Sequence, residues 1–181
     1  EDVDIWTFQA SEGETITCRA VAHSIGSPLD SVLELYGPSG RRLAENDDSF
    51  ASDSQIQCRV SETGTYRVHI FDNEFRGGQP YVYRLTVTRG EWLNRVFPLG
   101  GRRGTPTDFE LTGNDTTSSV NLGLPSLNTR GGTGLFHATY ALPGAAHVQR
   151  QLIDIDANPQ LDEDTAGQGI RDLPVTVNGR I

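Results

Sequence analysis

The sequence has no methionine and no lysine, and it has only two cysteines. All 15 basic residues are arginine, and 24 acidic residues bring the formal net charge to −9. Proteins that bind nucleic acid need basic patches to neutralise phosphates, so this charge balance argues against that class of partner. A chain that starts Glu-Asp-Val-Asp and contains no methionine is expected to be a mature or excised segment whose export signal would lie elsewhere.

Long apolar runs and amphipathic helices are also missing. No run reaches the roughly 18 apolar residues of a membrane-spanning helix, so we expect no membrane span. The 20 glycines and 9 prolines make turns frequent, and the segments between them alternate in polarity as strands do. Short strands separated by turns every 8–12 residues or so are typical of all-β sandwiches. A chain of 181 residues can form one large domain or two small ones.

Motifs of the common catalytic sites are absent. The four histidines occur in no His-Glu-x-x-His pattern, and two cysteines alone cannot form a usual structural zinc site. There is no Gly-x-Ser-x-Gly turn and no glycine-rich phosphate loop between a strand and a helix. The turn at 100–104 carries two arginines that could meet an anion, but a polar turn between strands is the simpler interpretation. We therefore expect a protein that is not an enzyme.

Each cysteine lies in an alternating segment on the side that carries apolar residues. Cys18 shares a face with Ile16 and Ala20, and Cys58 shares a face with Ile56 and Val60. A disulfide between neighbouring strands would close a loop of about 40 residues and contribute about 3–4 kcal/mol. The alternative is a pair of buried thiols in a reducing compartment.

An acidic loop follows the turn in the stretch 29–48. Calcium binds about six to eight oxygen ligands, often supplied by loops. The two strands of this stretch could bring Asp30 close to Asn46, Asp47 and Asp48, so these four residues are candidate calcium ligands. Alternatively, the loop residues cap turns and are solvated. Calcium is the only cofactor that the residues suggest.

Several motifs in residues 1–88 occur in an order that resembles the bacterial pre-peptidase C-terminal domain. They are DVDIWTF at 2–8, GETIT at 13–17, SPLDSVLELY at 27–36, GRRLAENDD at 40–48 and ETGTYRVHI at 62–70. The resemblance implies a jelly-roll-like β-sandwich, related in shape to the collagen-binding domains of clostridial collagenases. It also implies an extracellular or cell-surface protein, because this family is appended to secreted proteases and repeated in large secreted bacterial proteins.

The next segment, residues 89–160, contains FPLGGRRG at 97–104 and FELTG at 109–113. These motifs are similar to the opening of small immunoglobulin-like domains of multidomain bacterial surface proteins. The resemblance implies a second β-sandwich. Residues 161–172 are expected to form an acidic linker.

The end of the chain, LPVTVNGRI at 173–181, is predicted to be a strand. In the family that residues 1–88 resemble, such a strand belongs at the start of the domain. Either this chain is one repeat of a tandem polypeptide cut within a domain, or the strand completes the first sandwich in the same or a neighbouring molecule. The apolar residues of this assembly strand are Leu173, Val175, Val177 and Ile181.

Two functions remain open from the sequence. The first is an extracellular structural module that pairs head to tail with copies of itself or with adjacent repeats. The second is an accessory module of a secreted enzyme that binds a polysaccharide or a collagen-like polymer. The second function would need exposed aromatic residues, and the candidates are Trp6, Tyr36, Tyr81 and Trp92.

Overall fold

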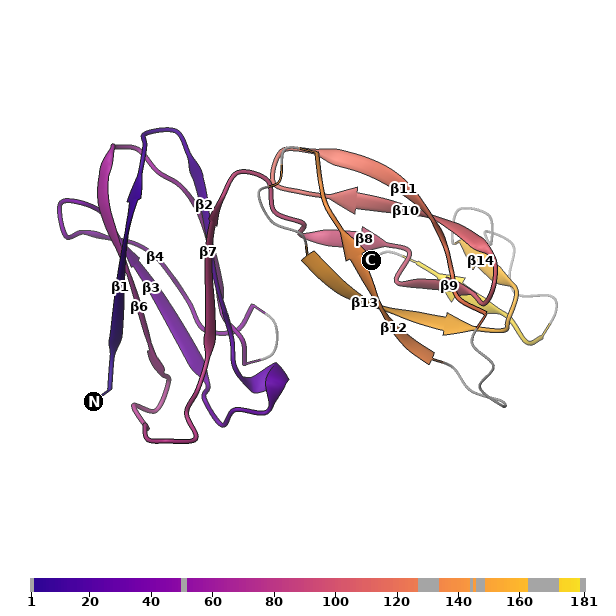
Figure 1. Ribbon diagram of the computed structural model, residues 1–181, viewed down its shortest axis with the longest axis horizontal. Coiled ribbons are helices and arrows are strands. Elements are labelled where there is room, and N and C mark those ends of the chain that lie inside the picture. Colours follow the sequence, from indigo (N-terminus) through magenta and orange to yellow (C-terminus); the bar gives the residue numbers. More distant parts are fainter. Residues whose placement is uncertain are drawn as a thin grey trace. The chain divides into compact units, whose positions relative to one another are not determined.

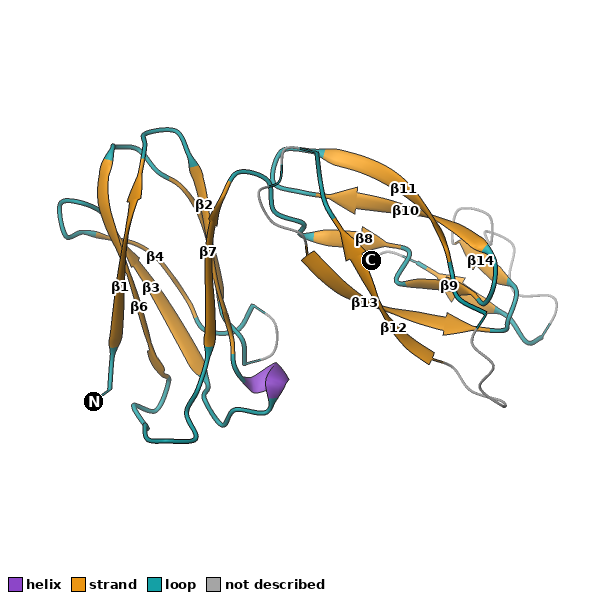
Figure 2. Cartoon of the chain, in the orientation of Figure 1, coloured by secondary structure: helices purple, strands orange, loops and turns teal. Residues whose placement is uncertain are grey.

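The computed structural model describes residues 2–49, 52–126, 134–143, 145, 149–162 and 173–179. The chain divides into two compact units, Glu1–Gly90 (unit 1) and Glu91–Ile181 (unit 2). Strands make up the regular structure of both units, and η1 (His23–Ile25) adds one short 3-10 turn (Figures 1 and 2). The predicted all-β class is therefore confirmed. Among the described residues, no helix has the length and apolarity needed to cross a membrane.

Unit 1 is built from two antiparallel sheets. One sheet has the strand order β1-β6-β3-β4 and the other has the order β5-β2-β7. The strands are β1 (Asp4–Ala10), β2 (Thr15–Val21), β3 (Ser31–Tyr36), β4 (Arg42–Asn46), β5 (Gln55–Arg59), β6 (Gly64–Asp72) and β7 (Arg84–Arg89). The predicted turn between β3 and β4 closes through a hydrogen bond from Gly40 N to Gly37 O, with Gly40 at a φ of 84°.

The core of unit 1 lies between its two sheets. Alternation along β6 buries Tyr66, Val68 and Ile70 while the residues between them are more exposed. Leu33 and Leu35 of β3 are fully buried in the same cluster. Burying each such side chain contributes about 1.5–3 kcal/mol relative to leaving it in water.

Unit 2 also has two main sheets. One has the order β11-β10-β8, and the other has the order β12-β13-β9, in which β9 runs parallel to β13. The strands are β8 (Arg95–Phe97), β9 (Gly100–Arg102), β10 (Pro106–Thr112), β11 (Thr117–Gly123), β12 (Gly134–Tyr140) and β13 (Gln149–Asp156). Only two residues separate β8 from β9. The chain therefore crosses directly from the first sheet, which contains β8, to the second sheet, which contains β9.

Phe109 and Ile155 are fully buried in the core of unit 2, which both sheets contribute to. The buried Gln149 side chain connects the second sheet to the segment before β8: it accepts from Leu93 N at 2.5 Å and donates to Leu93 O at 2.9 Å. The arrangement agrees with a β-sandwich. The finer assignments, jelly-roll-like for unit 1 and immunoglobulin-like for unit 2, stay predictions.

A separate two-stranded parallel sheet joins β14 (Gln160–Asp162) to β15 (Thr176–Asn178). β14 therefore covers the start of the segment that was expected to be a linker, and residues 163–172 lie outside the described residues. β15 lies within the predicted assembly strand. In this chain it pairs with β14 and not with a strand of unit 1.

Candidate functional site

One side of the unit 1 sandwich has two strand edges without a partner strand. β1 is the last strand of the first sheet, and β7 is the last strand of the second. Within the described part of the chain, neither has a strand on its outer side. We call the outer edges of β1 and β7 together the open edge.

Side chains alone bridge the two strands of the open edge. Trp6 Nε1 donates to the Tyr83 hydroxyl at 2.7 Å, and this hydroxyl donates to Asp4 Oδ2 at 2.6 Å. Arg89 Nη2 donates to the backbone carbonyl of Gln9 at 3.3 Å. No local pattern in the sequence predicts these contacts, because the residues that they join are 77, 79 and 80 positions apart.

Burial, followed by the hydrogen bond to Asp4, raises the pKa of the Tyr83 hydroxyl to about 12. The hydroxyl is therefore neutral at physiological pH and keeps its donor proton. The Trp6 indole is held in a fixed position although 53% of the residue is exposed. The chain thus presents a positioned aromatic surface at the open edge.

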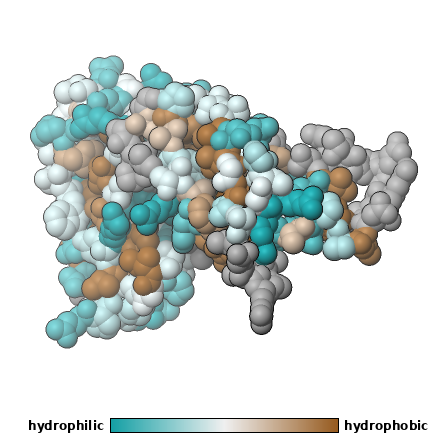
Figure 3. Space-filling model, turned by 45° about the vertical axis from the view of Figure 1, so that its right-hand side comes forward, coloured by the Kyte–Doolittle hydropathy of each residue, from teal (hydrophilic) through white to brown (hydrophobic). Residues whose placement is uncertain are grey.

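The other three aromatic candidates do not join Trp6 in one surface. Trp92 is only 2% exposed and belongs to unit 2. Tyr36 is half-buried, packs against His69 with the two rings tilted and their centroids 4.4 Å apart, and donates to Glu34 Oε2 at 2.8 Å. Tyr81 is half-buried. On the face of the molecule drawn in Figure 3, hydrophobic residues occur in several separate patches.

Two of the four predicted calcium ligands, Asn46 and Asp30, belong to different hydrogen-bond networks. Asn46 Oδ1 accepts from Ser49 Oγ and from Gln55 N, both at 2.8 Å, so it closes the turn after β4. Asp30 Oδ2 instead accepts from Asn73 Nδ2 at 3.4 Å. Asp47 and Asp48 are exposed. No group of three or more acidic, histidine or cysteine residues in the described ranges is arranged to hold a metal ion. Calcium binding stays a prediction for titration calorimetry to test.

The loop near Asp30 is organised by the buried carboxylate of Asp72. It accepts from Asp30 N at 3.1 Å, Glu74 N at 3.0 Å and Arg76 Nε at 2.9 Å. Burial alone would raise the pKa of Asp72, but the hydrogen bonds from the Arg76 side chain and the backbone N–H groups outweigh burial and lower it. Asp72 is therefore an ionised anchor that fixes the backbone of the loop.

The predicted disulfide is not present, and both cysteines are free thiols. The register of β2 and β5 pairs Cys18 with Ile56 and Cys58 with Ile16, so the two sulfurs belong to diagonal rather than directly opposite positions. Diagonal neighbours lie about 7–8 Å apart, whereas a disulfide needs Cβ atoms about 3.5–4.5 Å apart. Burial raises the pKa of Cys18 to about 12, with a smaller contribution from Cys58, so this thiol is not an activated nucleophile.

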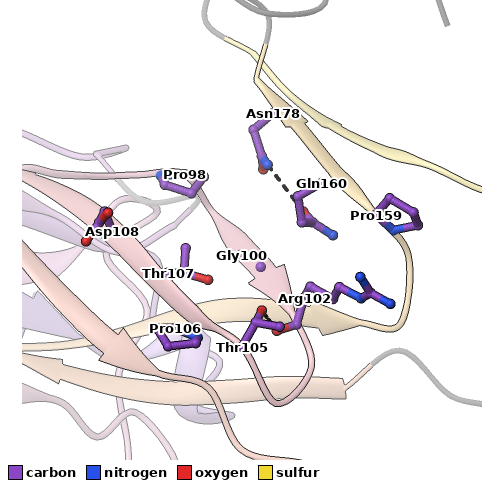
Figure 4. A pocket seen from close by; sticks show the side chains of 11 residues that line it. Pro98, Gly100, Arg102, Thr105, Pro106, Thr107, Asp108, Pro159, Gln160 and Asn178 are labelled. Atoms are coloured by element: carbon purple, nitrogen blue, oxygen red, sulfur yellow. Dashed lines mark hydrogen bonds between the residues drawn. The ribbon is translucent and has the colours of Figure 1, made fainter.

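Unit 2 contains a polar cavity of about 450 Å³ between β9, the start of β10 and the β14–β15 sheet (Figure 4). Its lining includes Arg102, Thr107, Asp108, Gln160 and Asn178. Asn178 Nδ2 donates to Gln160 Oε1 at 3.3 Å across its wall. Hydroxyl, amide and charged groups with no aromatic residue suit a polar, hydroxyl-rich ligand better than an apolar one.

The predicted assembly strand leaves apolar side chains in water. Leu173 is 83% exposed and Val177 is 42% exposed, whereas Val175 is half-buried. Ile181 lies outside the described residues. The pairing with β14 spans only three residues, so it uses little of the apolar surface of the strand.

Comparison with known proteins identifies part of unit 1. Residues 2–72 match the bacterial pre-peptidase C-terminal domain. A probable subtilase-type serine protease of Deinococcus radiodurans is 39% identical over 70 residues, which are 38% of this chain and 10% of the protease. The resemblance found in the sequence is confirmed for these residues, which include β1 to β6. The match ends before β7, and the immunoglobulin-like assignment of unit 2 is not confirmed.

Proposed function

We propose that this chain is a non-catalytic, extracellular structural module that joins neighbouring copies or repeats head to tail through residues 173–181. Domains of the matched family are typically non-catalytic modules of secreted proteases, which supports the first part of the proposal. The matched stretch is a small part of the similar protease, so the activity of that protein is not transferred to this chain.

The observation that carries the proposal is the exposure of the terminal strand. A strand with alternating apolar residues normally buries one face, yet Leu173 and Val177 remain in contact with water here. Exposed strands of this kind bind by adding to the edge of another sheet. A donor at one end and an acceptor elsewhere on the surface give a heterologous contact, which forms rings or fibres.

Sedimentation velocity of the full chain over a range of concentrations tests this proposal. We expect the average mass to rise with concentration for the unmodified chain. Val177→Asp should weaken self-association by about tenfold or more, because a carboxylate in a newly formed sheet is desolvated. The matched control is Ile25→Asp, which places the same charge at another exposed apolar residue, in the 3-10 turn of unit 1.

Ile25→Asp should leave self-association unchanged. A chain that stays monomeric at all concentrations, or that loses association equally in both variants, contradicts the proposal. Circular dichroism should confirm that both variants keep their strand content, so that a loss of folding is not mistaken for a loss of assembly.

The second candidate is a polymer-binding accessory module, which the exposed and positioned Trp6 favours. Aromatic rings bind sugars and other polymers through their faces, and the polar cavity of unit 2 offers hydroxyl-binding groups. Co-sedimentation with insoluble polysaccharides and with collagen checks this function. Trp6→Ala should abolish binding, whereas Phe75→Ala, a change at a comparably exposed ring, should have no effect.

A further inference from the structure

The backbone of β1 reveals which of its groups are available to another strand. The paired residues of β3 and β6 begin with Ser31 opposite Asp72. One position further along, the Asp30 carbonyl accepts a hydrogen bond from Asn73 N, so Asp30 and Asn73 form a bonded pair. Bonded and non-bonded pairs alternate in an antiparallel ladder, so Leu33 and Ile70 form a non-bonded pair. Ile70 therefore directs its N–H and C=O towards β1, where its partner is Asp4.

The same alternation continues along β1. If Asp4 bonds to β6, then Ile5, Thr7 and Gln9 direct their backbone groups to the outer side. The contact from Arg89 Nη2 to the Gln9 carbonyl agrees independently, because Arg89 lies on β7, across the open edge. Arg89 thus occupies the outer carbonyl of Gln9, and the outer N–H and C=O groups of Ile5 and Thr7 remain for an added strand.

β1 also lacks several of the features that normally protect an edge strand, and its one charged residue is Asp4 at its first position. It contains no lysine, no proline and no bulge in its pairing with β6. Ile5 is 54% exposed and Trp6 is 53% exposed, so each face of β1 presents one exposed apolar side chain next to the outer edge. An added strand would cover both side chains.

β15 in the terminal strand also has an outer edge, along which no other strand of the described residues pairs. Thr176 N donates to Pro159 O at 2.9 Å, so Thr176 faces β14. Val175 and Val177 therefore direct their backbone groups to the opposite edge. Pro174 has no N–H. Its backbone groups lie on the same side as those of Thr176, towards β14, so the missing donor does not interrupt pairing along the opposite edge.

Charge favours the terminal strand over a second β1 as the occupant. Residues 1–88 carry 14 acidic residues and 7 arginines, and Asp2, Asp4, Glu12 and Glu14 lie in or beside β1. Two β1 strands paired antiparallel would bring these carboxylates together. Residues 173–181 contain no acidic residue and one arginine, Arg180.

We propose that the outer edge of β1, at Ile5 and Thr7, accepts the outer edge of β15 from a second copy of this chain. β15 keeps its pairing with β14, and one sheet then runs from β14 and β15 of one copy into β1 and β6 of the next. This inference rests on the proposed function and adds the acceptor site to it. The Trp6–Tyr83–Asp4 contacts hold the Trp6 side chain next to this acceptor in place before the strand arrives.

Sedimentation velocity of the full chain with edge variants tests the acceptor. Thr7→Pro removes an N–H that points outward and leaves the β6 ladder intact, and Ile5→Lys adds the charge that blocks edges in other proteins. We expect both to weaken self-association by about tenfold. The matched control is Ser119→Pro on β11, another edge strand, where the Gly113–Thr116 bond shows that the Ser119 N–H also points away from its partner.

The outcomes separate the two proposals. If Val177→Asp and both β1 variants weaken association while Ser119→Pro does not, both proposals are supported. If Val177→Asp weakens association and neither Thr7→Pro nor Ile5→Lys does, the terminal strand couples copies but the acceptor is overturned. If none of these variants changes association, both are overturned. Should Thr7→Pro lose its strand content by circular dichroism, Ile5→Lys alone decides, because it changes an exposed side chain and no backbone bond.

Discussion

Two contacts that fix connecting segments, one chosen from each unit, differ in chemistry, although the carboxylates of Glu91 and Asp156 also accept backbone N–H bonds in unit 2. In unit 1 the fixing groups are the buried aspartates Asp53 and Asp72, and each accepts several backbone N–H bonds. In unit 2 one such contact is made by the neutral amide of Gln149, which binds both backbone groups of Leu93. A carboxylate depends on its charge and an amide does not. The contribution of Asp72 to the stability of unit 1 should therefore depend on pH, whereas the contribution of the Gln149 contact to unit 2 should not.

Core truncations should give the largest effects and should reveal whether the two units unfold separately. Phe109→Ala empties a fully buried site in unit 2 and should lower the free energy of unfolding of that unit by about 3–5 kcal/mol. Leu35→Ala should lower that of unit 1 by about 2–5 kcal/mol. If the units unfold separately, calorimetry of each variant should show one transition at a lower temperature than in the unmodified chain. This transition belongs to the unit that carries the substitution. A single transition that shifts equally in both variants would show that the units unfold together.

The amide contact of unit 2 should give the next largest effect. Gln149→Leu leaves the buried N–H and C=O of Leu93 without their partner and should cost about 2–3 kcal/mol. Because no charge is involved, the loss should be the same at pH 4 and pH 7. Chemical denaturation at the two pH values measures it. If the loss of unfolding free energy differed between pH 4 and pH 7 by more than the fitting error, the contact could not be the neutral amide contact that we assign.

The carboxylate contact of unit 1 should give a smaller and pH-dependent loss. Asp72→Asn keeps the shape but weakens the bonds from Arg76 and the backbone, and should cost about 1–2 kcal/mol at pH 7. The pKa of Asp72 is lower in the folded state than in the unfolded chain. Its contribution is therefore fully present above the unfolded pKa of about 3.9 and is lost as pH falls through the lower folded pKa. Variant and unmodified chain should converge in stability at acid pH, and a constant difference down to pH 2 would argue against an ionised Asp72.

The strands of unit 1 could be predicted from local pattern, and its contacts could not. The alternation in β3 and β6 places apolar residues at every second position, so the burial of Leu33 and Val68 could be expected from the sequence. The distance between Cys18 and Cys58 depends on the register of β2 against β5, which no local pattern specifies. The expected disulfide failed for this reason: the shared face was correct, and the pairing position was not.

Unit 2 shows the complementary limit. β11 contains only Val120 and Leu122 as large apolar residues, which are too few for the polarity pattern of the sequence to predict a strand. Pairing with β10 over seven residues forms it nevertheless. The acceptor edge of β1 could not be read from sequence either, because the direction of its N–H groups depends on the ladder between β3 and β6.

The smallest predicted effect concerns the hydroxyl that bridges the open edge. Tyr83→Phe removes the acceptor of the Trp6 indole and the donor to Asp4, and should cost only about 0.5–1.5 kcal/mol because both contacts are at the surface. Its effect on Trp6 should be larger than its effect on stability, since the indole loses the bond that positions it. The fluorescence of Trp6, isolated by a Trp92→Phe background, should become more accessible to acrylamide. Unchanged quenching would mean that packing alone positions Trp6, and the open edge of unit 1 would then be less preorganised than the amide-fixed segment of unit 2.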